Sequence, residues 1–300
     1  MSHSRKVADP ILHLKRTLLS LALCIICTSA FAESAGLASA RALFDAGKMP
    51  DARLAFEKLE ATDSDNADIH YYLGQIALDR DDADTAVREL ERSTALSPGS
   101  GRCHDALGDA YGRSAQKAGM LSKFGLARKS LAEYQHAVAL EPNNVDFHES
   151  LFGYYSGAPS IVGGGADKAA DEAAVIRKLD PLRGHRAYAT LYSADGKYDL
   201  ALAELGETLK ASPDDYGALY QVGRIAVLTG QNLDRGLASL RRCLTLAPPE
   251  GVPSHAAAQW RIGNILEKKA DKEGARAAYE AALKLDPGFT KASDALGNLK

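Results

Sequence analysis

Apolar and polar positions along this 300-residue chain repeat with a helical period, and one short pattern returns every 32 to 44 residues. In each copy an apolar residue precedes a glycine, a small residue follows, then a leucine or an aromatic residue, and finally a proline. The clearest copies are Leu73-Gly74, Ala86, Leu90, Pro98 and Ile262-Gly263, Ala275, Tyr279, Pro287. Glycine and alanine let two helices approach closely, whereas proline disfavours helix at the residue before it. Each copy therefore predicts one helical hairpin.

Seven copies of the pattern follow one another, and together they resemble the tetratricopeptide repeat, a helix–turn–helix module of about 34 residues. The copies close at Ser64, Pro98, Pro142, Pro181, Pro213, Pro248 and Pro287. The resemblance implies an all-α fold, a right-handed superhelical solenoid of about seven hairpins with a C-terminal capping helix. The expected solenoid domain is 33–300, with units at 33–66, 67–100, 101–144, 145–181, 182–215, 216–250 and 256–289, and the cap at 290–300.

Two units depart from the pattern. The third reaches Pro142 about ten residues late, so the segment Gly112 to Gly125 holds an insertion, which we expect to lengthen both helices of its hairpin. The fourth carries a segment rich in glycine, 156–165, where a short turn is expected. So many glycines, together with Pro159, cannot form a regular helix. We therefore expect a shaped loop between the two helices of the fourth unit.

The N-terminus lies outside the array. A leader with four basic residues precedes an uncharged stretch, 17–32, that ends in Ala30-Phe31-Ala32. This order is typical of a secretory signal peptide, here 1–32, cleaved before Glu33. The apolar run is shorter than the roughly 20 residues of a membrane-spanning helix, and a retained anchor is the alternative. We therefore expect an exported protein, with the periplasm as its compartment and no membrane span after cleavage.

Charge and cysteine content narrow the choice of partners. Removal of the leader shifts the formal net charge from −3 to about −6, which disfavours non-specific binding to nucleic acid. Cys103 and Cys243 then remain, in the third and sixth units. Because a solenoid unit contacts only its neighbours, we expect no disulfide between them.

Four histidines occupy the same place in successive first helices: His70, His104, His148 and His185. Equivalent places in neighbouring units are separated by about 8–10 Å per helix, whereas zinc needs ligand nitrogens about 2 Å away. We therefore expect packing roles for these histidines, and no metal. The glycines before Lys168 do not form a phosphate-binding loop, since Ala169 follows where Ser or Thr is needed. No signature of a catalytic nucleophile is present either, and we expect no cofactor.

The family resemblance implies that first helices line a concave groove that holds peptides. Carried over by position, its lining would be Asp68, Tyr71, Tyr72, Gln75, Arg102, Asp105, Asp109, Asp146, Glu149, Arg183, Arg186, Tyr220, Arg224, Trp260, Arg261, Asn264 and Lys268. The early half is mixed to acidic and the later half basic, with Tyr220 and Trp260 as flat anchors. This predicts an acidic or C-terminal peptide ligand with an apolar anchor. The alternative is that these charged residues have no ligand and simply lie on solvent-exposed faces of the helices.

Two classes of function follow. The first is a non-enzymatic protein–protein interaction scaffold of the bacterial envelope, which holds a peptide segment or a partner protein in the groove. The second is an enzyme, or an enzyme subunit, with a small-molecule site at the loop 158–165. The sequence identifies neither the partner nor the oligomeric state.

Export gives a direct test of the leader. Protein recovered from a bacterial host should begin at Glu33, because the basic leader, short apolar run and small residues before that position form a cleavage site. Mass spectrometry of the intact protein measures this. A mass that retains Met1 to Ala32 would contradict the prediction.

Overall fold

The structure, a computed structural model, describes residues 35–249 and 252–299, and the expected signal peptide, 1–32, lies outside them. The helices are α2 (Ala35–Asp45), α3 (Met49–Glu60), α4 (Ala67–Asp79), α5 (Ala83–Leu96), α6 (Gly101–Lys117), α7 (Met120–Leu140), α8 (Val145–Gly157), the short 3₁₀ helix η1 (Ser160–Val162), α9 (Ala166–Leu179), α10 (Pro181–Ala194), α11 (Tyr198–Ala211), α12 (Tyr216–Thr229), α13 (Leu233–Cys243), α14 (His255–Lys268), α15 (Lys272–Leu285) and α16 (Thr290–Asn298). None of the helices in these ranges is long and apolar enough to cross a membrane.

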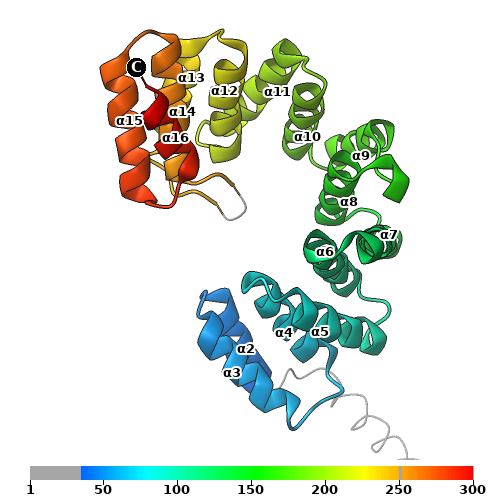
Figure 1. The fold of residues 1–300 in the computed structure, drawn as a ribbon. Helices are drawn as coiled ribbons and strands as arrows, with labels where there is room; N and C mark the ends of the chain where they lie inside the picture. The colour runs from blue at the N-terminus through cyan, green and yellow to red at the C-terminus, as the bar shows by residue number, and fades with distance from the viewer. Residues whose placement is uncertain (1–34, 250–251, 300) are drawn as a thin grey trace, which may run out of the picture. The chain divides into compact units, whose positions relative to one another are not determined.

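Consecutive helices pair as antiparallel hairpins, from α2–α3 to α14–α15, and α16 packs on α15 at the C-terminal end. The predicted all-α stack of seven hairpins with a capping helix is confirmed. The chain divides into two compact units after Pro98. Unit 1 holds α2 to α5 and unit 2 holds α6 to α16 (Figure 1). The repeat pattern predicts one domain, 33–300, and the division falls at Pro98, where the second copy of the pattern closes.

Four hairpins, α4–α5, α6–α7, α12–α13 and α14–α15, have a tight contact between a glycine of the first helix and a large side chain of the second. A Cβ atom on Gly74 would lie 2.4 Å from Cγ of Leu90, and one on Gly263 would lie 2.2 Å from Cε1 of Tyr279. Both partners are fully buried, with 0% exposure. The repeated glycine therefore sets how closely the first helix approaches the second.

The insertion in the third unit is helical, as predicted. Only Ala118 and Gly119 separate α6 from α7, and these two helices are the longest of the described chain, with 17 and 21 residues. The extension exposes large apolar side chains near the start of α7: Met120 is 79% exposed and Leu121 is 99% exposed. It therefore presents an apolar surface next to the hairpin of the fourth unit, because α7 packs against α8.

The glycine-rich segment forms the shaped loop expected between α8 and α9. Gly163 adopts a left-handed conformation, with φ of 98°, at the end of η1. Gly164 is so close to the backbone that a Cβ atom would lie 1.8 Å from the carbonyl oxygen of Ala158. The hydroxyl of Tyr154 lies 2.8 Å from the carbonyl oxygens of both Ala127 and Val162. The loop is therefore fixed against α7 and α8.

The helix contact can be tested by adding one methyl group. Gly263→Ala should lower the free energy of unfolding by about 1–3 kcal/mol, because the new Cβ atom overlaps the buried ring of Tyr279. Gly125→Ala is the matched control, since Gly125 lies within α7 with nothing near its Cβ position. It should leave stability unchanged or raise it by up to about 1 kcal/mol. Urea unfolding measures both, and equal effects would contradict the account.

Candidate functional site

The hairpins of unit 2 from α6 to α11 form a curved row. The first helices, α6, α8 and α10, lie on its inner side, and the second helices, α7, α9 and α11, lie on its outer side (Figure 1). Among the predicted groove residues of this unit, Asp109 and Lys268 are exposed. Asp146 is exposed as well. Those that are half-buried are Arg102, Asp105, Glu149, Arg183, Arg186, Arg224, Trp260, Arg261 and Asn264. In unit 1, Tyr71 and Gln75 are half-buried on α4. These residues therefore keep part of their surface open to a ligand.

The expectation that Tyr72 and Tyr220 face the groove is wrong. Each is only 5% exposed and belongs to a hydrophobic core. The ring of Tyr72 stacks on Phe56 with centroids 4.9 Å apart, because Tyr72 shares the buried face of α4 with Ile69 and Ile76. The hydroxyl of Tyr220 accepts a hydrogen bond of 2.7 Å from Nε of Arg261. Neither ring is an open anchor for a ligand.

The basic character of the later half is weaker than the sequence predicts. Arg183 forms ion pairs with Asp146 and with Glu149, the latter at 3.1 Å. Arg186 lies 3.0 Å from a carboxylate oxygen of Asp215. These carboxylates offset the two positive charges, so the arginines contribute little net attraction for an acidic ligand.

The aromatic end of the predicted groove is largely occupied by the protein itself. Trp260 packs edge-on against Phe289, with centroids 6.1 Å apart, and the guanidinium carbon of Arg261 lies 5.0 Å from the centroid of the Trp260 ring. Asn264 donates a hydrogen bond of 2.9 Å to the hydroxyl of Tyr279. Arg224 donates one of 3.0 Å to Gln221. Trp260 therefore offers an edge rather than a free face.

A pocket of about 620 Å³ lies between α6, α7, α8 and the start of the glycine-rich loop. We call it the α6–α8 pocket. Its lining is Asp109, Gly112, Ala115, Gln116, Lys123, Phe124, Ala127, Ser130, Tyr134, Ser150, Gly153, Tyr154, Gly157, Ala158, Pro159 and Val162. Most of these side chains are small or apolar, which gives the pocket its room. The insertion and the glycine-rich loop, the two departures from the repeat, thus meet at one site.

Asp109 and Lys123 are the charged residues of the pocket lining, and Asp105 lies one helical turn before Asp109 on α6. Asp109 lines it and accepts a hydrogen bond of 2.7 Å from the hydroxyl of Tyr134. Burial of its carboxyl group raises the pKa of Asp109, although part of the residue reaches solvent, and Tyr134 and Arg113 oppose this effect. Burial, with the nearby charges of Asp109 and Asp146, raises the pKa of Asp105 to about 7 against the hydrogen bond with Ser150.

One oxygen of Asp105 lacks a partner. Its Oδ1 atom is buried and has no hydrogen bond from any residue that the structure describes. Burial of an uncompensated carboxylate oxygen costs free energy, and such groups are rare in folded proteins. Ser150, the hydrogen-bonding neighbour of Asp105, itself lines the α6–α8 pocket. The unpartnered oxygen of Asp105 thus lies next to a residue of the pocket lining.

The loop beside the pocket does not present amide hydrogens to an anion. The N–H groups of Gly163, Gly164 and Gly165 donate to the carbonyl oxygens of Ser160, Pro159 and Tyr155. Lys168, which could have served a phosphate, instead donates a hydrogen bond of 2.9 Å to the carbonyl oxygen of Gly163. The segment is thus a structural wall of the pocket.

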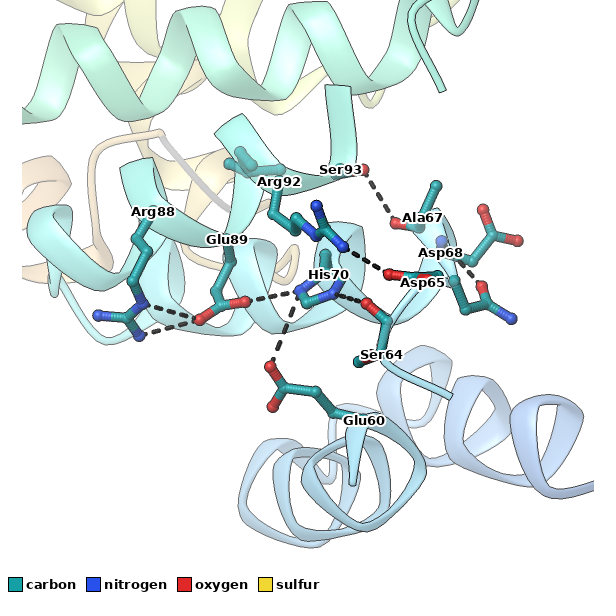
Figure 2. Close-up of polar contacts among 12 residues, drawn as sticks. Glu60, Ser64, Asp65, Ala67, Asp68, His70, Arg88, Glu89, Arg92 and Ser93 are labelled. Atoms are coloured by element: carbon teal, nitrogen blue, oxygen red, sulfur yellow. Dashed lines mark hydrogen bonds and ion pairs between the residues drawn. The ribbon is translucent and has the colours of Figure 1, made fainter. Parts of the chain in front are cut away.

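The four recurring histidines each contact a glutamate from the second helix of the same hairpin. Each distance joins the histidine Nδ1 atom to a glutamate Oε2 atom. The pairs are His70 with Glu89 at 2.9 Å, His104 with Glu133 at 2.6 Å, His148 with Glu172 at 2.6 Å and His185 with Glu204 at 2.5 Å. At His70 and His148, Nε2 also meets a backbone carbonyl oxygen, at 2.9 and 3.1 Å. Figure 2 shows the His70 pair in unit 1. Sequence reasoning compared the histidines only with one another and missed these partners.

The two cysteines of the described chain, Cys103 and Cys243, are both buried and are not bridged. Burial raises the pKa of the Cys243 thiol to about 12. A thiol with a raised pKa is a poor nucleophile, so Cys243 acts as a small core residue.

The fold and its repeats define a class of protein, an array of helical hairpins with a repeated helix contact. Models of the tetratricopeptide repeat match residues 37–101, 187–250 and 256–289, just over half of the chain. The chain belongs to the tetratricopeptide repeat family. Proteins built from this repeat are generally scaffolds for protein–protein interaction. No curated protein sequence matches the chain.

Several solved structures have the same fold. A tetratricopeptide repeat protein from Parabacteroides merdae is 14% identical, with a TM-score of 0.63, over 87% of this chain and 96% of that one. PilF from Pseudomonas aeruginosa is 14% identical, with a TM-score of 0.54, over 76% and 95%. Yeast Tom70 is 15% identical, with a TM-score of 0.60, over 84% of this chain and 51% of its own. Likeness at this level of identity establishes the fold.

The pKa of Asp105 predicts how stability depends on pH. A folded-state pKa of about 7, above the ordinary value near 3.9, means that the folded protein holds this proton more tightly than the unfolded chain does. The contribution of Asp105 to stability is therefore lost as the pH rises from about 4 to about 7. Asp105→Asn should raise the free energy of unfolding by roughly 1–3 kcal/mol at pH 8 and should have little effect at pH 4.

Urea unfolding at a series of pH values measures this difference. Asp294→Asn, at an exposed position of α16, controls for the loss of one negative charge. If Asp105→Asn changes the free energy of unfolding by the same amount at pH 4 and at pH 8, the raised pKa of Asp105 is contradicted.

Proposed function

We propose that this protein is a non-enzymatic interaction scaffold that holds a peptide segment of a partner along the first helices of unit 2. Repeat arrays bury little of their inner surface against themselves and commonly use it for binding. The family membership supports this kind of function. The α6–α8 pocket supports its location, because it combines open volume, apolar walls and the carboxyl group of Asp109 at one place on the array.

The chemistry of the pocket favours a basic residue with apolar neighbours as the bound segment. Lysine and arginine have a long apolar stem and a cationic tip. The stem fits between Phe124, Ala127 and Val162, and the tip would reach Asp109. Hydrogen bonds between charged groups are stronger than those between neutral groups, and they are strongest in a site with little water.

The apolar neighbours of that basic residue have their own contact surface. Met120 and Leu121 lie one turn before Phe124 on α7, and both are almost fully exposed. Large apolar side chains at such exposure commonly mark a protein interaction surface. A leucine or similar residue beside the bound lysine would cover them.

This proposal changes the ligand expected from the sequence. An acidic peptide would need free positive charge, and Arg183 and Arg186 are already paired with carboxylates. Arg224, Lys268 and the edge of Trp260 remain proposed contacts for a longer ligand. The location is also proposed: the leader at 1–32 supports export to the periplasm, where the partner would be met.

The volume of the α6–α8 pocket favours a second candidate, a small-molecule site. Its 620 Å³ lies within the range of about 300–1,000 Å³ that is usual for ligand pockets. Such a site would support the alternative of an enzyme or an enzyme subunit at this loop. The two candidates differ in the need for Met120 and Leu121, which lie outside the pocket lining and would matter only to a peptide.

Binding of short labelled peptides tests the proposal. Peptides with a central lysine, glutamate or norleucine between leucines are compared by fluorescence anisotropy with the purified protein. The lysine peptide should bind most tightly. Asp109→Asn should weaken its binding at least tenfold, because the ammonium group loses its charged partner in a partly desolvated site. Asp294→Asn should leave binding unchanged.

A second pair of variants separates a peptide from a small ligand. Leu121→Ser should weaken binding of the lysine peptide without loss of stability, since Leu121 is 99% exposed, whereas Leu228→Ser, on α12 at 51% exposure, should not. Tighter binding of the glutamate peptide would overturn the assigned chemistry. Equal binding by wild type, Asp109→Asn and Leu121→Ser, all with unchanged circular dichroism, would overturn the site.

A further inference from the structure

Three potential metal ligands from three helices converge in unit 1. Nδ1 of His70 on α4 lies 2.9 Å from Oε2 of Glu89 on α5 and 3.9 Å from Oε1 of Glu60 at the end of α3 (Figure 2). The three ligand atoms all lie within 4.8 Å of one another. The imidazole nitrogen thus faces two carboxylate groups.

We propose that Glu60, His70 and Glu89 bind one divalent transition-metal ion, with Zn²⁺ as the matching species. A tetrahedral zinc site with bonds of about 2.0–2.1 Å places neighbouring ligand atoms about 3.3 Å apart. The observed separations of 2.9 and 3.9 Å lie on either side of that value. Together with the limit of 4.8 Å on all three separations, this allows small side-chain shifts to form the site.

The surrounding hydrogen bonds already orient two of the ligands. Nε2 of His70 lies 2.9 Å from the carbonyl oxygen of Ser64, which can only accept, so Nε2 carries the hydrogen. A neutral imidazole then presents its lone pair at Nδ1, toward the carboxylates. Arg88 donates two hydrogen bonds to Oε1 of Glu89, at 3.1 and 2.9 Å, and leaves Oε2 facing His70. Such outer contacts are typical of metal-binding histidines and carboxylates.

The cluster of Glu60, His70 and Glu89 requires a positive charge between its three ligand atoms. Two carboxylates and an imidazole lone pair repel one another unless a cation lies among them. Either a second proton on the His70 ring or a metal ion meets this requirement. Imidazole with carboxylates suits zinc, whereas calcium and magnesium prefer oxygen ligands alone.

The cluster has a route for an ion and for a fourth ligand. A pocket of about 320 Å³ is lined by Glu60 and Glu89, together with Arg53, Arg80 and Arg88. The Glu60 side chain is 37% exposed, while that of His70 is 6% exposed. Three protein ligands beside a water-accessible space leave one position of the zinc shell open to water.

Other hairpins of the chain supply internal controls. His148 repeats the arrangement with Glu172 and the carbonyl oxygen of Pro142. Within the described residues, the His148 pair belongs to no three-ligand group, and the one other such group is His104, Glu133 and His136 in unit 2. The expectation of no metal rested on the distances between histidines alone, whereas two of the three ligands here are carboxylates, one from the same hairpin and one from the preceding hairpin.

Zinc content measured by mass spectrometry tests the proposal, after treatment of the purified protein with EDTA and equilibrium dialysis against micromolar ZnCl₂. The His136→Ala background removes the second group of ligands. This variant should bind one equivalent of zinc, and its thermal midpoint should rise with zinc because the metal binds only the folded state. Adding Glu60→Gln should reduce bound zinc at least tenfold and abolish the rise. Adding Glu172→Gln instead should change neither.

Two outcomes overturn the proposal. One is that the His136→Ala protein binds no zinc. The other is that the protein with both His136→Ala and Glu60→Gln keeps its full equivalent. Glu60 is half-exposed and glutamine has the same shape, so this variant tests ligation without removing core packing. Neither outcome depends on the proposed peptide site, which lies in unit 2.

Discussion

The close approach of two helices within each hairpin is the constraint on which the rest of the structure depends. In four of the hairpins a glycine on the first helix receives a leucine or tyrosine from the second, with no room for a methyl group at Gly74 or Gly263. This contact fixes which face of each first helix is buried and which stays open. In α4–α5 and α6–α7 it also sets the distance between the helices at which a histidine of the first meets a glutamate of the second.

The proposed binding pocket lies where the repeat is interrupted. The insertion lengthens α6 and α7, and the glycine-rich loop closes the space between them and α8. A regular repeat would fill that space with side chains of its neighbours. Here Gly112, Gly153 and Gly157 leave it open, while Asp105 and Asp109 bring carboxyl groups to its edge. In unit 1, a single added carboxylate, Glu60, turns an ordinary histidine–glutamate pair into a group with the geometry of a metal site.

Periodicity predicted the hairpins, the lengthened third unit and the shaped loop, because each depends on local rules for glycine, proline and helix spacing. Side-chain partners were predicted less well. Tyr72 and Tyr220 were assigned to the groove by their place in the repeat, yet both are buried, since each lies on the core-facing side of its helix. Arg183 and Arg186 were counted as free charge, and only the three-dimensional stack places Asp146, Glu149 and Asp215 beside them. The α6–α8 pocket could not be predicted, because it arises from residues of three helices and a loop.

The proposed function requires that a peptide segment with a basic residue between apolar residues binds at the α6–α8 pocket. Hydrogen–deuterium exchange of the purified protein, with and without a peptide that has lysine between leucines, tests it most directly. Bound peptide should slow exchange in α6, the first half of α7, the end of α8 and the loop 158–165, because ligand binding stabilises these segments against local opening. Slowed exchange confined to other helices, or none at saturating peptide, would contradict the account.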